Sequence, residues 1–246
     1  MSDSMNLERL FGLKGKTALV TGGSRGIGFM IARGLLEAGA RVYITARKAE
    51  ACEQAAAELA AWGECVAVPA NVTAESDRRA LIDRLAADGD RLHILVNNAG
   101  TAWGQPYSEY SQSGFAKVME TNVNAVFCLT RDLTPLLERA AAPEDPARVI
   151  NIGSIEGLHV PSVHSQGNYA YTASKAAVHH LTRHLAVELG QQHAVAHVEQ
   201  AGGIVFRNGP AGVAQGIDAD DVLVHLQGVH APVRRRVGRS LAVART

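Results

Sequence analysis

The stretch TALVTGGSRGIG, residues 17–28, combines a strand pattern, a glycine-rich turn and the start of a helix. Residues 17–21 are β-branched or aliphatic with no polar alternation, which is typical of a parallel strand covered on both faces. Gly22, Gly26 and Gly28 follow directly, and glycine lets the backbone turn tightly and approach a ligand. Backbone N–H groups at the start of the next helix then face an anion. The stretch predicts a strand–turn–helix unit that cradles a phosphate.

The alternation of short apolar runs and helical patterns continues along the chain. Further strand candidates, each continuous and rich in Val, Ile or Leu, are residues 41–46, 65–70, 93–99 and 148–154. Helical patterns lie between them, and several end at a glycine, the residue preferred just past a helix. This repetition predicts an α/β fold, a three-layer doubly wound parallel sheet of the Rossmann type. In that context we expect the glycine turn to bind a dinucleotide; a glycine-rich turn without a ligand is the alternative.

The composition indicates a globular protein with a substantial core. The 246 residues are 47% hydrophobic and 20% charged, and the formal net charge of +0 gives no reason to expect nucleic acid or a membrane surface as partner. The three cysteines are widely spaced and odd in number, which excludes a disulfide framework and fits a reducing compartment. No apolar run suits a leader or a membrane span. We therefore expect a cytoplasmic protein with a single dinucleotide-binding domain, residues 1–246.

The segment after the second strand favours NADP over NAD as the cofactor. An NAD site usually carries an Asp or Glu about 20 residues past the glycines, which binds the ribose hydroxyls. Here the segment reads TARKAE, residues 45–50, with Arg47 in that region, and Arg25 lies inside the glycine turn. Guanidinium groups bind phosphate oxygens in pairs, which suits a 2′-phosphate. The alternative is that both arginines are solvated surface residues.

Five motifs in consistent order resemble the classical short-chain dehydrogenase/reductase family. They are TGGSRGIG (21–28), NNAG (97–100), TNV (121–123), NIGS (151–154) and YTASK (171–175). The resemblance covers about residues 12–190. It implies hydride transfer between a nicotinamide and a carbonyl or alcohol carbon of a small substrate, with NADPH-driven reduction. The pattern is most similar to the 3-oxoacyl-thioester reductases, a ketoreductase class, while sugars, polyols and other small ketones stay open as substrates.

The spacing of Tyr171 and Lys175 itself indicates acid–base chemistry. A free tyrosine has a pKa of about 10, which makes it a poor proton donor and acceptor at neutral pH. Residues four apart share a helix face, so the Lys175 ammonium would lie beside Tyr171 and favour its phenolate. Tyr169 has only Ala173 at the matching position. We therefore expect Tyr171 to carry the proton and Tyr169 to be a packing or substrate-pocket residue.

The resemblance implies the other site residues. Ser154 would hydrogen-bond the substrate oxygen, and Lys175 would also hold the nicotinamide ribose. Asn122 would interrupt its helix and complete a proton relay; a hydrogen-bonded core asparagine is the alternative. Asn71 stands where the family more often has Asp at an adenine contact. The expected cofactor-binding residues are Gly22, Ser24, Arg25, Gly26, Ile27, Gly28, Arg47, Asn71, Val72, Asn98, Ala99, Gly100, Tyr171 and Lys175.

His180 and His184, four residues apart, could chelate a metal ion. No Glu lies between them as in a zinc-protease pattern, and no third ligand is evident in the sequence. We expect no metal and place both on the outward face of their helix. Family members commonly pair this helix across a dimer interface, so the resemblance implies a homo-oligomer.

The resemblance weakens after Gly190. Family members continue with a strand that ends in Pro-Gly, a substrate lid and a last strand, whereas HAVAHVEQAGGIVF stands here, with Glu199 and Gln200 where apolar residues are usual. We expect residues 191–246 to be an atypical tail, replaced or translated out of frame from about residue 193. Loss of the sixth and seventh strands would then destabilise the protein and open its active site. The alternative function is a catalytically impaired dinucleotide-binding protein.

Overall fold

The computed structural model describes residues 11–159, 167–190 and 194–199. The chain divides into two compact units, Met1–Ala214 and Gln215–Thr246, and every described residue belongs to the first. The expectations for the substrate lid, for the seventh strand and for the frame of the tail beyond residue 199 lie outside the described residues. Within the described part, no helix has the length and apolar character needed to cross a membrane.

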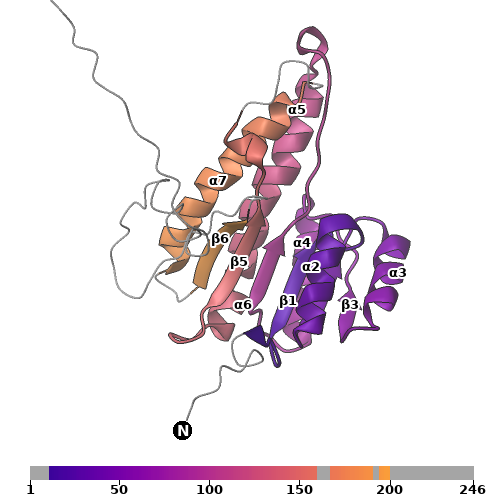
Figure 1. Cartoon of the computed structure of the whole chain (residues 1–246), viewed down its shortest axis with the longest axis vertical. Coiled ribbons are helices and arrows are strands. Elements are labelled where there is room, and N and C mark those ends of the chain that lie inside the picture. The colour runs from indigo at the N-terminus through magenta and orange to yellow at the C-terminus, as the bar shows by residue number, and fades with distance from the viewer. Residues whose placement is uncertain (1–10, 160–166, 191–193, 200–246) are drawn as a thin grey trace, which may run out of the picture. The chain divides into compact units, whose positions relative to one another are not determined.

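Six parallel strands form one sheet in the order β3-β2-β1-β4-β5-β6 (Figure 1). Their bounds are β1 Thr17–Thr21, β2 Arg41–Thr45, β3 Cys65–Ala67, β4 Ile94–Asn97, β5 Ala147–Ile152 and β6 Ala194–Glu199. The first five confirm the strands predicted from the apolar runs. The chain moves outward from β1 to β3 and then returns to add β4 on the other side of β1. A ligand crevice is expected at the carboxyl ends of β1 and β4, where the direction of winding reverses.

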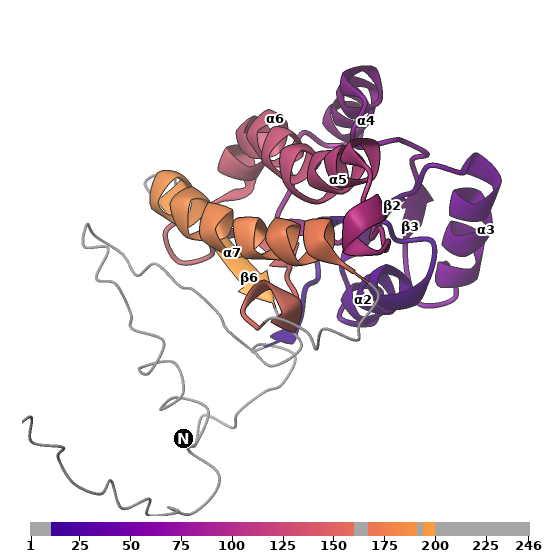
Figure 2. The same ribbon diagram turned by 90° about the horizontal axis from the view of Figure 1, so that it is seen from above.

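Helices cover both faces of the sheet and complete the predicted three layers (Figure 2). One face packs on α2 (Gly26–Glu37) and α3 (Ala49–Leu59). The other packs on α4 (Glu75–Ala87), α6 (Ala125–Ala140) and α7 (Tyr169–Gly190). Because successive side chains of a strand point to opposite faces, β1 supplies Ala18 and Val20 to the first core and Leu19 to the second.

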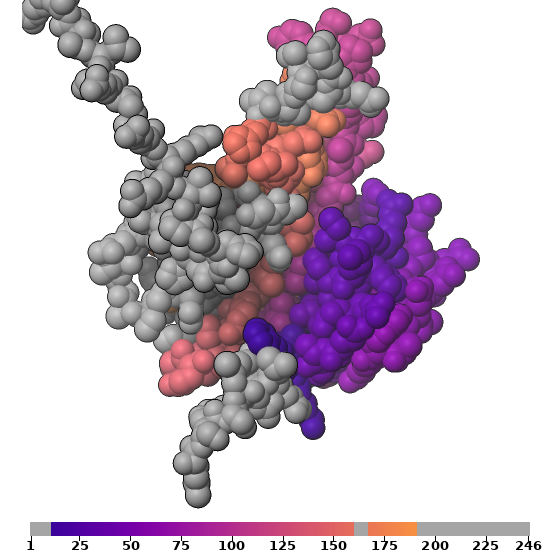
Figure 3. Space-filling model, viewed as in Figure 1, coloured from indigo at the N-terminus to yellow at the C-terminus, as the bar shows by residue number. Residues whose placement is uncertain are grey.

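The described halves of the chain lie side by side in the space-filling view, the first coloured indigo to purple and the second pink to orange (Figure 3). In the sheet the same boundary falls between β1 and β4, which are hydrogen-bonded neighbours from Ala18↔Ile94 to Val20↔Val96. The switch point therefore separates the half that carries the glycine turn from the half that carries α7.

The prediction that the sheet loses its sixth strand is wrong. β6 pairs in parallel with β5 over its whole length, from Ala147↔Ala194 to Ile152↔Glu199. The prediction rested on the loss of family resemblance after Gly190 and on the polar residues Glu199 and Gln200. A ladder is formed by backbone N–H and C=O groups, which every residue except proline carries, and Glu199 is only the last residue of the strand.

Candidate active site

The glycine turn after β1 has the shape of a phosphate cradle. Gly22 and Gly26 adopt φ angles of 66° and 57°, in the left-handed region that favours glycine. A Cβ on Gly28 would lie 2.4 Å from both Asn98 Nδ2 and the carbonyl oxygen of Gly22. Arg25 is the N-cap of α2, and its side chain makes no capping bond to the first N–H groups of this helix. Such a helix start attracts an anion.

A threonine that the sequence analysis missed holds the turn in place. The Thr21 hydroxyl oxygen accepts hydrogen bonds from the backbone N–H groups of Asn98, at 3.0 Å, and Ala99, at 2.9 Å. The Asn98 amide in turn donates to the Thr21 carbonyl at 2.9 Å. These bonds tie the exit of β1 to the exit of β4. Asn98 and Ala99 were predicted from their motif, but no pattern indicated that Thr21 would be their partner.

The two arginines predicted to bind a 2′-phosphate follow the carboxyl ends of the neighbouring strands β1 and β2. β1 and β2 pair in register up to Thr21↔Thr45, and Arg25 and Arg47 each follow one of these strand ends. Both arginines are exposed, as is Ile27 at 61%, while Ser24 is half-buried. The structure thus leaves an open, positively charged surface next to the glycine turn.

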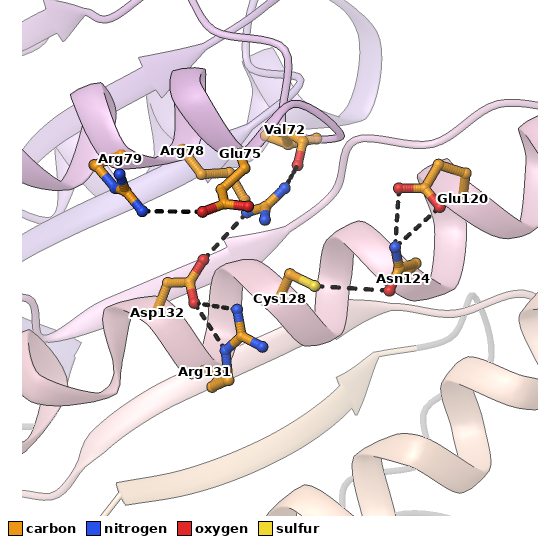
Figure 4. Close-up of polar contacts among 9 residues, drawn as sticks. All are labelled: Val72, Glu75, Arg78, Arg79, Glu120, Asn124, Cys128, Arg131 and Asp132. Carbon is orange, nitrogen blue, oxygen red and sulfur yellow. Dashed lines mark hydrogen bonds and ion pairs between the residues drawn. The ribbon is translucent and has the colours of Figure 1, made fainter.

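The predicted adenine loop, residues 71–72, is fixed by neighbours. Asn71 Oδ1 accepts from the Thr73 hydroxyl at 3.0 Å, so the acceptor expected to face adenine already has a partner. Val72 is buried, and its carbonyl accepts from Arg78 Nη1 at 3.1 Å. Arg78 also donates to Asp132 Oδ2 of α6 at 3.2 Å (Figure 4). Arg78 is 6% exposed and links this loop to α6. Its position in a charged helical segment gave no sign of this role in the sequence.

Asn122 lies in a π-helical turn, η2 (Glu120–Asn124), between α5 (Gln112–Met119) and α6. Its side chain is 2% exposed and fully used: Oδ1 accepts from Thr101 N at 2.8 Å, and Nδ2 donates to Thr101 O and to Ser174 Oγ, each at 2.9 Å. The helix is interrupted where the resemblance implied, and the polar side chain is satisfied, as the alternative required. Both descriptions apply to the same residue.

Tyr171 and Lys175 share one face of α7, as their spacing predicts. Lys175 Nζ lies 5.6 Å from the centre of the Tyr171 ring and donates to the Ile152 carbonyl of β5 at 2.7 Å. Lys175 is 7% exposed, and this burial lowers the pKa of its ammonium to about 8. Ser174 joins the same network, because its hydroxyl donates to the Tyr171 carbonyl at 2.7 Å.

Ser154 follows β5 at the start of the 3-10 turn η3 (Ile155–Gly157). Its hydroxyl oxygen accepts from Glu156 N at 3.2 Å, which leaves the hydroxyl hydrogen able to donate elsewhere. Its backbone N–H donates to His179 Nε2 at 3.3 Å. His179 is buried on α7, and sequence reasoning overlooked it in favour of the exposed His180 and His184.

Tyr169 packs against other aromatic side chains next to the site. Its ring makes edge-to-face contacts with Tyr110, at 5.3 Å between centres, and with Tyr107, at 5.7 Å. The Tyr110 hydroxyl donates to the Trp103 carbonyl at 2.8 Å and accepts from Ala170 N at 3.3 Å. Tyr110 therefore anchors the loop after β4 to the first turn of α7, while Tyr107 is 82% exposed.

A buried ladder of polar side chains lies beneath the site. Asn97 Nδ2 donates to Thr130 Oγ1 at 3.1 Å and to Asn151 Oδ1 at 2.8 Å, and Asn151 Nδ2 donates to Thr182 Oγ1 at 2.8 Å. These four residues belong to β4, α6, β5 and α7, and none is more than 5% exposed. Among the described residues, no group of three or more His, Cys, Asp or Glu side chains could hold a metal ion.

The structure thus brings the four predicted catalytic residues onto segments that contact one another. Asn122 reaches α7 through Ser174, Lys175 reaches the end of β5 through Ile152, and Ser154 reaches α7 through His179. The glycine turn and the NNAG motif meet through Thr21. Arg25 and Arg47 lie exposed after the carboxyl ends of β1 and β2.

Comparison with known proteins gives consistent matches. Residues 16–205 match the family model described as short chain dehydrogenase, so the match extends through β6. A rhamnolipid-biosynthesis 3-oxoacyl-[acyl-carrier-protein] reductase of Pseudomonas aeruginosa is 55% identical over 183 residues, covering 74% of this chain and 70% of the relative. Gluconate 5-dehydrogenase of Gluconobacter oxydans is 36% identical over 185 residues, covering 74% and 68%.

Solved structures agree with these matches. The Pseudomonas aeruginosa RhlG/NADP active-site complex is similar with a TM-score of 0.73 and 53% identity, covering 76% of this chain and 72% of the other. A short-chain type dehydrogenase/reductase from Mycobacterium marinum is similar with a TM-score of 0.72 and 31% identity, covering 79% and 77%.

Proposed function

The chain belongs to the short-chain dehydrogenase family, and from that premise we propose that it is an NADP-dependent ketoreductase acting on 3-oxoacyl thioesters. The observation that carries the proposal is the placement of Tyr171 and Lys175 on one face of α7, joined through Ile152 to the strand end that presents Ser154. Because the strands are parallel, the carboxyl end of β5 and the glycine turn after β1 lie at the same end of the sheet.

The residues present fit a dinucleotide with a 2′-phosphate. The turn holds Gly22 and Gly26 at positive φ angles and leaves no room for a side chain at Gly28. It directs the start of α2, which the Arg25 side chain does not cap, at an anion. Arg25 and Arg47 would hold the 2′-phosphate, since no acidic residue follows β2 directly. The similar RhlG structure is an NADP complex, which supports the same choice here.

The chain's own residues supply the proton chemistry. When bound, the nicotinamide supplies the hydride to the substrate carbon. Tyr171 would donate its phenolic proton to the substrate oxygen, and the Ser154 hydroxyl would donate a hydrogen bond to the same oxygen and stabilise charge that develops there. Lys175 would hold the nicotinamide ribose and keep positive charge beside Tyr171. Asn122 would hold the loop at Thr101 and the first turn of α7 in a fixed relation.

The substrate class is supported by the relatives. The 55% identical relative is a 3-oxoacyl-[acyl-carrier-protein] reductase, whereas the gluconate dehydrogenase is much less similar. We therefore favour a 3-oxoacyl thioester over a sugar acid.

The decisive experiment measures NADPH consumption with a 3-oxoacyl thioester and, separately, with a 5-ketogluconate. We expect turnover with the thioester and, for Tyr171→Phe, a kcat lowered by about 10²- to 10⁴-fold, a far larger change than that in NADPH affinity. Equal rates for the wild type and Tyr171→Phe would contradict the catalytic assignment. Tight NADPH binding without turnover of any ketone would contradict the enzyme proposal itself.

Assembly and location complete the proposal. Family resemblance supports a homo-oligomer that pairs through α7, where His180 and His184 are exposed, and three free cysteines fit the cytoplasm. Light scattering on the purified protein tests the first statement, since a monomer at all concentrations contradicts it. Cell fractionation tests the second.

A further inference from the structure

We propose that His179 is a positioning residue, whose imidazole sets the place of Ser154 relative to Tyr171. The inference deepens the proposed reductase function and rests on it. None of the motifs that identify the family includes this histidine, and its role follows from three contacts around η3.

The first contact is the hydrogen bond from Ser154 N to His179 Nε2, at 3.3 Å. An imidazole nitrogen that accepts a hydrogen bond carries no proton, so the neutral ring must hold its proton on Nδ1. His179 is 5% exposed, so water does not compete freely for this bond. Burial, with the nearby positive charges of Lys175 and Arg183, lowers the pKa of His179 and keeps the accepting form at neutral pH.

The second contact is steric. A Cβ added to Gly157 would lie 2.5 Å from His179 Cε1 and 2.8 Å from the Lys175 carbonyl carbon. The turn η3 therefore lies directly against the imidazole and the backbone of α7, with no space between them. Loss of the acceptor at position 179, or a side chain too short to reach the turn, would let η3 move, and Ser154 begins this turn.

The third contact is the hydrogen bond from Lys175 Nζ to the Ile152 carbonyl, one helical turn before His179. Tyr171, Lys175 and His179 follow one another at four-residue spacing, so they lie along one face of α7. Lys175 holds the Ile152 carbonyl and His179 holds the Ser154 N–H, on either side of Gly153. The exit of β5 is thus bonded at two points to the helix that carries Tyr171, which holds the backbone of Ser154 against that helix.

Three variants test the role. His179→Phe keeps a ring but has no acceptor, His179→Gln offers an amide oxygen as acceptor, and His180→Gln is the matched control because His180 is the exposed neighbour. We expect His179→Phe to lower kcat about tenfold, with NADPH affinity and KM nearly unchanged, because small displacements at a reacting group are costly. His179→Gln should recover most of the loss, and His180→Gln should match the wild type.

A double-mutant cycle separates positioning from general damage. If His179 acts through Ser154, His179→Phe should cause less than a twofold further loss in a Ser154→Ala background. On the wild-type protein, nitrogen NMR should show an unprotonated Nε2 for His179 at neutral pH. The proposal is overturned by a full tenfold loss in the Ser154→Ala background, by a protonated Nε2, or by His179→Gln as slow as His179→Phe. The Tyr171→Phe comparison is independent, so failure here would leave the proposed reductase intact.

Discussion

The glycine turn after β1 and the buried face of α7 contribute to the same site by different means. In the turn, the absence of side chains is what matters: Gly28 has backbone and amide atoms where a Cβ would stand. On α7, the site depends on polar side chains that are buried and paired, such as Lys175 with Ile152 and His179 with Ser154. The first region should fail when atoms are added, and the second should respond when a buried polar group is removed or changes its protonation.

Gly28→Ala should give the largest effect and tests the first half of this comparison. The added methyl group would force the Gly22 carbonyl and the Asn98 amide apart, and we expect a loss of about 3 kcal/mol or more in the free energy of unfolding. NADPH binding should be lost at the same time. Denaturant unfolding and fluorescence titration measure the two effects, and normal NADPH affinity would mean that the turn is not the cradle.

Lys175→Met tests the second half through pH. The pKa of Lys175 is lowered to about 8 in the folded protein from 10.5, so between these values the unfolded wild type binds more protons than the folded one. Stability of the wild type relative to Lys175→Met should therefore rise with pH across this window, by about 3 kcal/mol in total. Denaturant midpoints of both proteins from pH 7.5 to about pH 11 check this. Parallel curves would show that the ammonium is not desolvated.

Thr21→Val should have a smaller effect, because it removes an acceptor without adding bulk. The Ala99 N–H would lose its partner in a part-buried place, at a cost of about 2 kcal/mol. Thr45→Val is the matched control: Thr45 pairs with Thr21 in the sheet and is also buried, but its hydroxyl makes only a long bond, of 3.4 Å, to the Ala70 carbonyl. Equal losses for the two variants would assign the effect to the threonine site in general.

Gly34→Ala should give the smallest effect, of opposite sign. Gly34 lies inside α2 with nothing within 4 Å of an added Cβ. Alanine there should raise the free energy of unfolding by about 0.5–1 kcal/mol, since glycine is a poor helix former. Thermal unfolding of Gly34→Ala beside Gly28→Ala would show whether the cost at residue 28 comes from its surroundings. Destabilisation by Gly34→Ala would break that distinction.

Local patterns predicted most of the fold. Five strands, the helices between them and the glycine turn follow from runs of apolar residues and from glycine, which act on their immediate neighbours in the chain. The doubly wound parallel sheet and the shared helix face of Tyr171 and Lys175 also follow, because winding rules and helix periodicity are general. The sixth strand was rejected because the family resemblance weakens after Gly190 and because two polar residues stand in its place, although pairing with β5 depends on the backbone.

Partnerships between distant residues could not be predicted. Thr21 contacts residues more than 70 positions away, Arg78 joins α4 to α6, and His179 meets Ser154 only after β5 and α7 are packed. Each of these residues is of a common type in an ordinary helix or strand, so the sequence carries no local signal for it. His180 and His184 drew attention because of their spacing, whereas burial singles out His179.

The buried ladder of Asn97, Thr130, Asn151 and Thr182 has a consequence for how the molecule assembles. Asn97 finds its partners on β5 and α6, and Asn151 finds its partners on β4 and α7, so the two amides together need both strands aligned at Asn97↔Asn151 and both helices in place. A chain with one helix docked, or with either strand slipped by one position, would enclose amide groups that have neither water nor protein to bind. Docking of α6 and α7 should therefore be all-or-none. The same four side chains lie under the site, so a partly formed site should be unstable.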